Sequence, residues 1–478
     1  MACRGWLMLG LLLPLAGCMT VGPDYEVPEA FVETQWSQLP DGVHDTSSAD
    51  TAWWNTFDDA VLVSLLTRAE EANRTLREAE ARVERAQALR RTVRATAGPR
   101  VDVEGSATRR RTSRNTSNNN ENSAYRTEFD IGLDASWELD LFGGVRRASE
   151  AAAARVESEM ERLHAARLAL RAEVARSYYA VRGTQIRVAN TQTNIALLTK
   201  TLDLIGNLSR LGEASEFDVT RARGQLQLTQ SRLPLLDAEI REGIYRLSIL
   251  VGETPGTLLE EMEQLVSLPA LPDLIPVGQA SDVLRRRPDI RVAERELAAA
   301  TADVGAAKAD LFPRFDLLGG LGRTADTLDD LGQAASARYV GAGFIRWPVF
   351  QSGSIRAGIE AEEAETREAA ARYEQTVLEA LADAESALIR YVSQRQTTAL
   401  LRDAVASRRI SVELSRRLFE TGEEDFLAVL DAERELISVE DELVVSETSE
   451  RLSLIALYAA LGGGWEPSSI EAGEGSDE

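Results

Sequence analysis

The sequence predicts a mainly α-helical protein with a small β part, internally duplicated, in which long α-helical hairpins alternate with pairs of strands. Three observations support this fold class. One stretch alternates strictly between apolar and polar residues, two very long stretches without proline carry apolar residues at helical spacing, and the same landmarks recur at an offset of about 210 residues.

The alternating stretch runs from Tyr125 to Leu141. Apolar residues dominate the odd positions, and the even positions are mostly charged, including Asp130, Asp134 and Glu138. In an extended strand this pattern places the apolar groups on one face and the carboxylates on the other. A transmembrane β-barrel strand needs such a pattern because its outer face meets lipid and its inner face meets water. We therefore expect these carboxylates to face a water-filled lumen.

The N-terminus has the form of a lipoprotein signal peptide. An apolar run from Trp6 to Leu15 follows a basic residue, and the small pair Ala16-Gly17 precedes Cys18. An ordinary signal peptide or a short membrane anchor is the alternative, but ~10 apolar residues are too few to span a bilayer. We expect cleavage after residue 17 and a lipid on Cys18.

Composition excludes several classes of function. The formal net charge of −24 argues against nucleic-acid binding. The two histidines, His44 and His164, fall in different elements and have no metal-ligand spacing. A phosphate-binding glycine loop is also absent. We therefore predict no catalytic site, no metal and no cofactor. After the signal, no segment reaches the ~20 apolar residues of a membrane-spanning helix, so a bilayer crossing would consist of strands.

The repeat is defined by matched landmarks. Leu211-Gly212-Glu213 matches Thr421-Gly422-Glu423, and Leu250-Val251-Gly252 matches Ala460-Leu461-Gly462. The predicted divisions are the signal peptide 1–17, a lipid-anchored extended segment 18–52, repeat one 53–253, a linker 254–280, repeat two 281–464 and an acidic disordered tail 465–478.

Each copy is expected to hold a helix, two strands and a long helical hairpin, in that order. Pro99 and Pro313 end the first helices, because proline removes a backbone donor and restricts the preceding residue. For copy one we predict helix 59–97, strands 100–108 and 125–141 around a solvated loop 109–124, and helices 145–205 and 215–251. For copy two we predict helix 281–311, strands 314–322 and 338–347, and helices 354–420 and 425–461.

Glycine and proline mark the hairpins. Gly212 and Gly422 stand where one long helix should end and the next begin. Pro234 is expected to kink the first returning helix. The linker should contain at most a short helix around 258–265. Apolar spacings of three and four along the long helices favour coiled-coil seams over a thick core.

Four strands cannot close a barrel, and an open sheet edge in lipid would leave backbone groups unpaired. Two chains would give a barrel filled by its own side chains. Three chains, with twelve strands, are the smallest number that leaves a passage, so we predict a homotrimer.

Short motifs occur in a specific order along this repeat. They are Val21-Gly22-Pro23-Asp24-Tyr25, Trp53-Trp54 with Phe57, the segment 137–143, Arg287-Pro288-Asp289, Leu430-Asp431-Ala432 and the segment 461–465. In this order they resemble the TolC-type outer-membrane efflux channels, in particular the lipoprotein branch. The resemblance implies a trimeric twelve-stranded transmembrane β-barrel and a periplasmic α-barrel of twelve helices. It also implies a lipid anchor in the outer membrane, a periplasmic adaptor and an inner-membrane pump of the resistance-nodulation-division type.

The resemblance also implies a gate at the second helical hairpin. Leu427 and Asp431 match positions that ring the closed aperture in the family, and Arg434 lies one turn beyond Asp431. Some members latch this region with a tyrosine before the glycine and an arginine after it, whereas this chain has Phe419 and Glu424.

The candidates for a different latch are two acid–arginine pairs, Asp218 with Arg221 and Asp431 with Arg434. The alternative for the second pair is a solvated helix pair without function. The hairpin tips, residues 211–213 and 421–423, are the expected adaptor contacts.

The leading functional hypothesis is a passive, gated exit duct for drugs or other small molecules. A type I protein secretion duct and a periplasmic coiled-coil scaffold without a pore are the alternatives.

Overall fold

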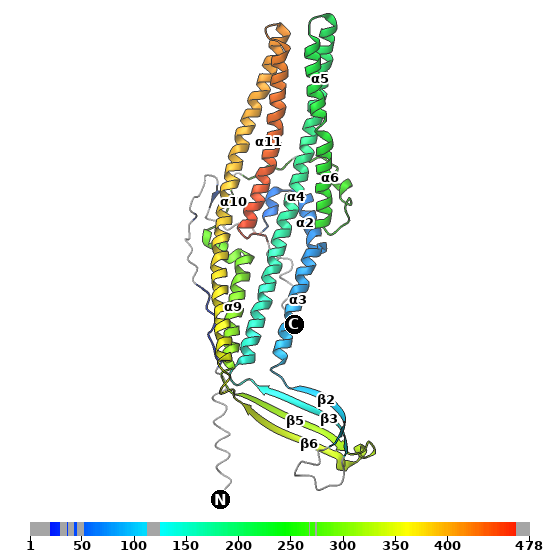
Figure 1. Ribbon diagram of the computed structural model, residues 1–478. Coiled ribbons are helices and arrows are strands. Elements are labelled where there is room, and N and C mark those ends of the chain that lie inside the picture. Colours follow the sequence, from blue (N-terminus) through cyan, green and yellow to red (C-terminus); the bar gives the residue numbers. More distant parts are fainter. Residues whose placement is uncertain are drawn as a thin grey trace. The chain divides into compact units, whose positions relative to one another are not determined.

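The computed structural model describes residues 20–28, 36, 43–44, 52–111, 125–266, 268–272 and 275–464. Cys18, the tail 465–478 and all but the first residues of the loop 109–124 lie outside these ranges. The fold is mainly α-helical with one four-stranded sheet, as the sequence predicts (Figure 1).

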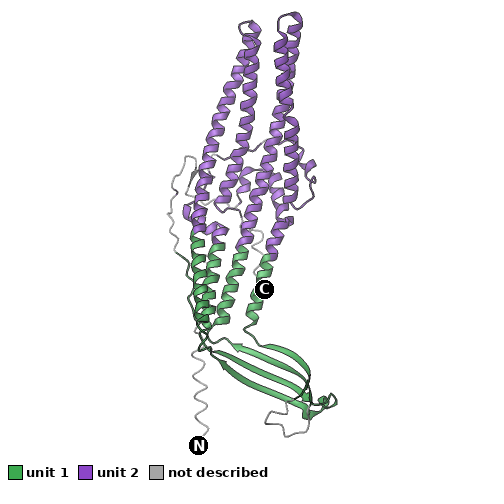
Figure 2. Cartoon of the chain, in the orientation of Figure 1, with its two compact units in different colours: residues 1–29, 82–160, 292–374 green, residues 30–81, 161–291, 375–478 purple. Residues whose placement is uncertain are grey.

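The chain divides into two compact units, and each draws on both sequence repeats (Figure 2). We call residues 1–29, 82–160 and 292–374 the strand unit, because they include the four-stranded sheet. Residues 30–81, 161–291 and 375–478 form the hairpin unit, which includes both helical hairpins. The predicted repeat and linker boundaries remain predictions.

The sheet of the strand unit is antiparallel throughout. Its strands are β2 (Arg100–Arg110), β3 (Arg126–Leu139), β5 (Arg314–Ala325) and β6 (Ala337–Arg346), in the order β2-β3-β5-β6. Leu133 of β3 lies opposite Val103 and Leu321. This register gathers the odd-numbered apolar residues on one face, which confirms the face that the alternation predicts. The second strand pair is less regular, since Val340 and Phe344 lie on the polar face.

The first long helix is longer than predicted, and the two long helices of the second hairpin lie within one residue of their predicted bounds. These helices are α4 (Gly144–Leu211) and α10 (Ser354–Thr421), and α11 (Phe426–Ala460) returns from α10. The other return is split into α5 (Glu216–Gln230) and α6 (Leu233–Leu250). The kink predicted at Pro234 is therefore a full interruption, and the proline fits in the first turn of α6, where a missing N–H costs nothing.

The first helix of each copy is two helices, not one as predicted. They are α2 (Ala60–Ala72) with α3 (Arg74–Ala95), and α8 (Ala280–Arg286) with α9 (Pro288–Ala309). Asn73 separates the first pair because its backbone is extended and its side chain caps α3 by accepting from the Leu76 N–H at 3.0 Å. Pro288 separates the second pair, since it cannot continue the hydrogen bonding of α8.

The remaining elements are short. They are β1 (Val43–His44), which pairs in parallel with β4 (Ile275–Pro276), η2 (Trp53–Phe57), α7 (Leu259–Met262), η3 (Asp329–Gly332) and η4 (Ala334–Ser336). The short helix predicted in the linker is α7, but the sequence pattern did not indicate the β1–β4 pairing. In the part of the chain that the structure describes, no helix is long and apolar enough to cross a membrane.

Both hairpins turn on a glycine in the left-handed region. Gly212 has φ 81° and Gly422 has φ 75°. In each turn the next N–H closes a bond to the helix: Glu213 to the Leu208 carbonyl and Glu423 to the Leu418 carbonyl, both at 2.9 Å. This is the Schellman arrangement, in which a side chain at the glycine position would strain the backbone.

Candidate functional site

The two hairpins of the hairpin unit pack against each other close to their turns. Phe419 of α10 meets Phe426 of α11 edge to face, with ring centroids 5.8 Å apart. The buried cluster around them consists of Ile205, Val219, Ala222, Phe426, Val429 and Leu430. These residues come from α4, α5 and α11, so the cluster joins the first hairpin to the second.

One residue from each predicted latch pair meets the other across the hairpins, a pairing that was not predicted from the sequence. An Nη2 atom of Arg221 on α5 lies 3.8 Å from Oδ1 of Asp431 on α11. The same guanidinium lies 5.5 Å from the ring of Phe217. The structure does not bring Asp431 and Arg434 of α11 together, because Asp431 faces Arg221 and Arg434 is exposed, without an ion pair to any described residue. A latch role for Arg434 stays a prediction.

Asp218 forms a capping box with Ser215, and its predicted latch role stays a prediction. Its carboxylate accepts from the Ser215 N–H at 3.1 Å, and the Ser215 hydroxyl accepts from the Asp218 N–H at 3.2 Å. This capping box begins α5 and satisfies two backbone donors at the turn. Asp218 therefore takes no part in the Arg221–Asp431 contact, although all three residues lie near the hairpin turns.

The other predicted hairpin residues differ in accessibility. Leu427 is half-buried beside the buried Phe426. The six tip residues, Leu211, Gly212, Glu213, Thr421, Gly422 and Glu423, are exposed. Leu211 is the large apolar one among them and is 73% exposed, so it is accessible to a partner.

The predicted carboxylates of β3 share one face and are ion-paired. Arg338 of β6 makes two bonds of 2.7 Å to Asp130 and lies 3.8 Å from Asp134. Arg314 lies 3.9 Å from Glu138. The negative charge of this face is therefore partly balanced by arginines, which the alternation of β3 alone did not reveal.

The segment that follows Cys18 is docked on the strand unit. The buried Arg147, in the first turn of α4, donates to the Val21 carbonyl at 3.2 Å and to Asp24 at 2.6 Å. Gly22 lies so close to Gly305 that a Cβ would stand 2.3 Å from the Gly305 Cα. These contacts explain Val21, Gly22 and Asp24 of the motif and hold the chain from the third residue after the predicted lipid site.

We expect Arg147→Ala to release this segment. Asp24 is 87% exposed and contributes little, but the Val21 carbonyl loses a charged donor, a loss of about 1–3 kcal/mol. Limited proteolysis of the purified protein should then cut within residues 20–28 several-fold faster. Arg146→Ala is the matched control, because the Arg146 side chain is 43% exposed and its hydrogen bonds to described residues go to the nearby Asp140 and Leu141. Equal cleavage rates for the two variants would contradict the assignment.

The comparison with known proteins decides the family. The family described as "Outer membrane efflux protein" matches residues 65–253 and 280–463. The chain belongs to this family.

Individual relatives are similar over nearly their whole length. The chain is 32% identical to the solvent efflux pump outer membrane protein SrpC of Pseudomonas putida, over 96% of this chain and 97% of that one. It is 31% identical to the cation efflux system protein CusC of Escherichia coli O157:H7, over 95% and 97%. Among solved structures, the outer-membrane channel OprN is similar with a TM-score of 0.87 and 35% identity, over 94% of this chain and 100% of that one.

The open state of the Neisseria gonorrhoeae MtrE outer membrane channel is also similar, with a TM-score of 0.80 and 26% identity, over 94% of this chain and 99% of that one. The protein is thus an outer-membrane channel subunit of a tripartite efflux system. The resemblance inferred from the motifs is confirmed.

Sequence reasoning missed the most buried ionic group of this efflux protein's hairpins. Glu433 of α11 is 1% exposed, accepts from Arg416 of α10 at 2.6 Å and lies 3.4 Å from the Thr201 hydroxyl of α4. It therefore ties three helices together. A signal was present, because Glu433 occupies the same helical stripe as the buried Leu430 and Ile437.

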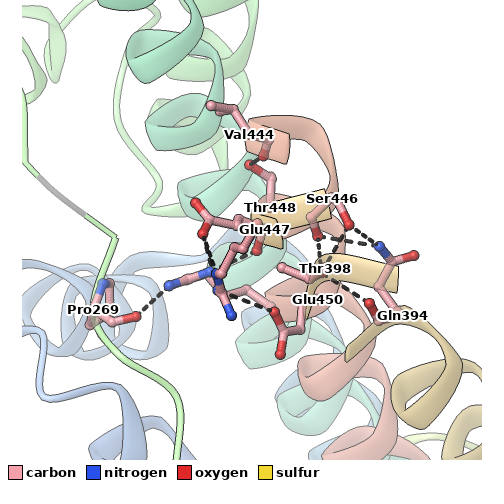
Figure 3. A network of polar contacts seen from close by, with 10 residues as sticks. Pro269, Gln394, Thr398, Val444, Ser446, Glu447, Thr448 and Glu450 are labelled. Atoms are coloured by element: carbon pink, nitrogen blue, oxygen red, sulfur yellow. Dashed lines mark hydrogen bonds and ion pairs between the residues drawn. The ribbon is translucent and has the colours of Figure 1, made fainter. Parts of the chain in front are cut away.

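A second buried polar network joins α10, α11 and the linker (Figure 3). Arg451 donates to the carbonyls of Glu447 and Pro269, and burial lowers the pKa of its guanidinium. Burial also raises the pKa of Glu450 above its usual range. Thr398 and Ser446 hydroxyls lie 2.8 Å apart in the same network. Its groups bond each other and carbonyls, which indicates a structural joint. Among the described residues, no cluster of three or more histidines, cysteines or acids could hold a metal ion.

Proposed function

We propose that three copies of this channel subunit form a passive, gated exit duct for small molecules, lipid-anchored through Cys18 and closed at the hairpin ends. The observation that carries the proposal is the sheet of the strand unit. Its apolar face is open to solvent in one copy, with about half of the surface of Ile131 and Leu133 exposed. Such a face on soluble protein would be a liability. In a membrane, the same apolar face would contact the lipid acyl chains.

The edges of the sheet support three copies. Within the described residues, β3 and β5 each have two neighbours, while β2 and β6 each have one unpaired edge. In lipid these edges must be paired, and pairing β2 of one copy with β6 of the next leaves no edge once the ring closes. Twelve strands then surround a passage, whereas eight would be filled by side chains.

Exposed apolar stripes on the hairpin unit support the same assembly. Leu378, Ile389 and Leu400 on α10 are exposed at intervals of about eleven residues, and so are Phe217 and Leu228 on α5. Eleven residues complete three helical turns, so each set lies on one face. Within this unit, α10 and the α5–α6 pair lie at opposite edges, with α4 and α11 between them (Figure 1). Two different edges that meet between copies generate a ring.

Membership of the family supports a proposal about the partners but does not decide the cargo. The exposed tips, 211–213 and 421–423, are the proposed contacts for a periplasmic adaptor, which would couple the duct to an inner-membrane pump of the resistance-nodulation-division type. SrpC is named for solvents and CusC for cations, and this chain is 32% and 31% identical to them. The similarity therefore favours neither cargo. We propose a passive conduit rather than an enzyme, driven by its partner pump.

The proposal is tested by reconstituting the purified, acylated full-length protein in planar bilayers. We expect a trimer that dissociates only on heating in detergent, and discrete conductance steps. A monomer that carries no ion flux would overturn the proposal.

The gate is proposed to be held closed in part by the Arg221–Asp431 contact. Both side chains are more than one-third exposed, so the pair contributes about 0.2–1 kcal/mol. Asp431→Ala should therefore raise the closed-state conductance by a factor of about 1.4 to 5. Arg434→Ala is the matched control on the same helix. Arg221→Ala should have the effect of Asp431→Ala, and the double variant should add nothing more. Additive effects would show that the two residues act separately.

A further inference from the structure

One end of the sheet carries an uncompensated group of arginines. Arg109 and Arg110 end β2 and Arg111 follows; we call these three the distal arginines. All three are exposed, in a chain whose net charge is −24. Arg110 lies opposite Arg126 of β3, and like charges at such positions destabilise a strand pair.

The contacts of the distal arginines leave their charge unbalanced. The guanidinium carbons of Arg109 and Arg111 each lie 5.4 Å from the ring centre of Tyr125. This contact holds two cations near one aromatic ring without neutralising either. None of the three makes an ion pair with a described residue of its own chain.

Acidic residues occupy the connection between β5 and β6. Asp330 fixes this turn, since it accepts from the Thr327 hydroxyl at 2.7 Å and from the Gln333 amide at 2.6 Å. Asp329 is exposed and has no ion pair in the described part of the chain. Asp326 lies 3.4 Å from Arg126, with both side chains 69% exposed. We call Asp326 and Asp329 the turn acids.

The strand directions bring these two groups together between copies. β2 runs toward the distal arginines, whereas β6 begins after the turn acids and runs away from them. Neighbouring strands in this sheet are antiparallel, so β6 of a second copy would pair with β2 in the same way. The connection that precedes Ala337 would then lie beside Arg110, the last residue of β2.

We propose that the distal arginines of one copy form ion pairs with the turn acids of the neighbouring copy, and that this contact selects the β2–β6 pairing that closes the ring. The inference rests on the proposed trimer. A second copy is favoured over a lipid phosphate because its acids lie at the one sheet edge that β2 must meet. Charge complementarity of this kind chooses partners and register more than it adds affinity.

Charge reversal tests the contact in the full-length, acylated protein. Arg109→Glu/Arg110→Glu/Arg111→Glu and Asp326→Arg/Asp329→Arg should each lower the temperature at which the trimer dissociates in detergent. Combining all five changes should recover most of the loss. The control is Arg90→Glu/Arg91→Glu/Arg94→Glu on α3, which changes the charge equally at exposed positions.

A cysteine pair tests proximity. The mature chain would hold no thiol besides the acylated Cys18, so Arg110→Cys/Asp329→Cys should give covalent trimers on mild oxidation, whereas Arg90→Cys/Asp329→Cys should not. A different result would be a loss of stability in the arginine variant alone that occurs only when phosphorylated lipids are present and that the acid changes do not recover. That result would overturn the proposal in favour of lipid binding. A conducting trimer of Arg110→Cys/Asp329→Cys that forms no cross-links would refute this contact while leaving the proposed function intact.

Discussion

Glu433→Ala should raise the closed-state conductance of the reconstituted channel about tenfold. Glu433 is almost fully buried and accepts from Arg416, and it links α10 and α11 to Thr201 of the first hairpin. Its loss would leave the Arg416 guanidinium without its carboxylate. Because Arg416 is 40% exposed, water can solvate it in part, and we expect a cost of about 1–2 kcal/mol rather than the larger cost of a fully buried pair. About 1.4 kcal/mol corresponds to a factor of ten in the open population.

A neighbouring ion pair supplies the control. Glu435 lies on the same helix and pairs with Arg408, but both side chains are 46% exposed. Glu435→Ala should therefore change the conductance little. Glu433→Gln keeps an acceptor for Arg416 and should give an intermediate current. Circular dichroism and trimer content separate gate opening from unfolding. Equal currents for the Glu433 and Glu435 variants would contradict a closing role for the buried carboxylate.

The sequence predicts the regular elements well because periodicity is a local property. The alternation around Leu133 fixed the faces of β3, and Gly212 and Gly422 located both hairpin turns, since each signal depends on neighbouring residues only. Helix interruptions at Asn73 and Pro288 were harder to foresee. The Asn73 amide donates to the Leu250 carbonyl at 2.8 Å, a partner that is distant in sequence.

The candidate site shows the same limit. The family resemblance drew attention to Asp431, but its partner Arg221 lies on a different helix, and only packing of the two hairpins brings them together. Likewise, the sequence shows Asp218 only as an acid near an arginine, and the structure is needed to reveal its capping box with Ser215. Charges on long helices have several partners within reach, so spacing alone does not select one.

The largest loss of stability is expected for Trp53→Ala, at about 3–5 kcal/mol. Trp53 is fully buried in the hairpin unit, stacks on Tyr458 with ring centroids 5.7 Å apart, and meets Phe57 at 6.2 Å. Its indole N–H has no partner among the described residues, so the loss reflects packing alone and Trp53→Phe should recover much of it.

Trp54→Ala is the matched control: Trp54 is half-buried and its ring lies 4.6 Å from the Arg171 guanidinium, a contact of about 0.5–2 kcal/mol. Because unfolding of a membrane trimer is commonly irreversible, the measurement is the half-life of helical signal at a fixed temperature. If both tryptophan variants lost helix at the same rate, Trp53 could not be the packing centre at which η2 meets α11.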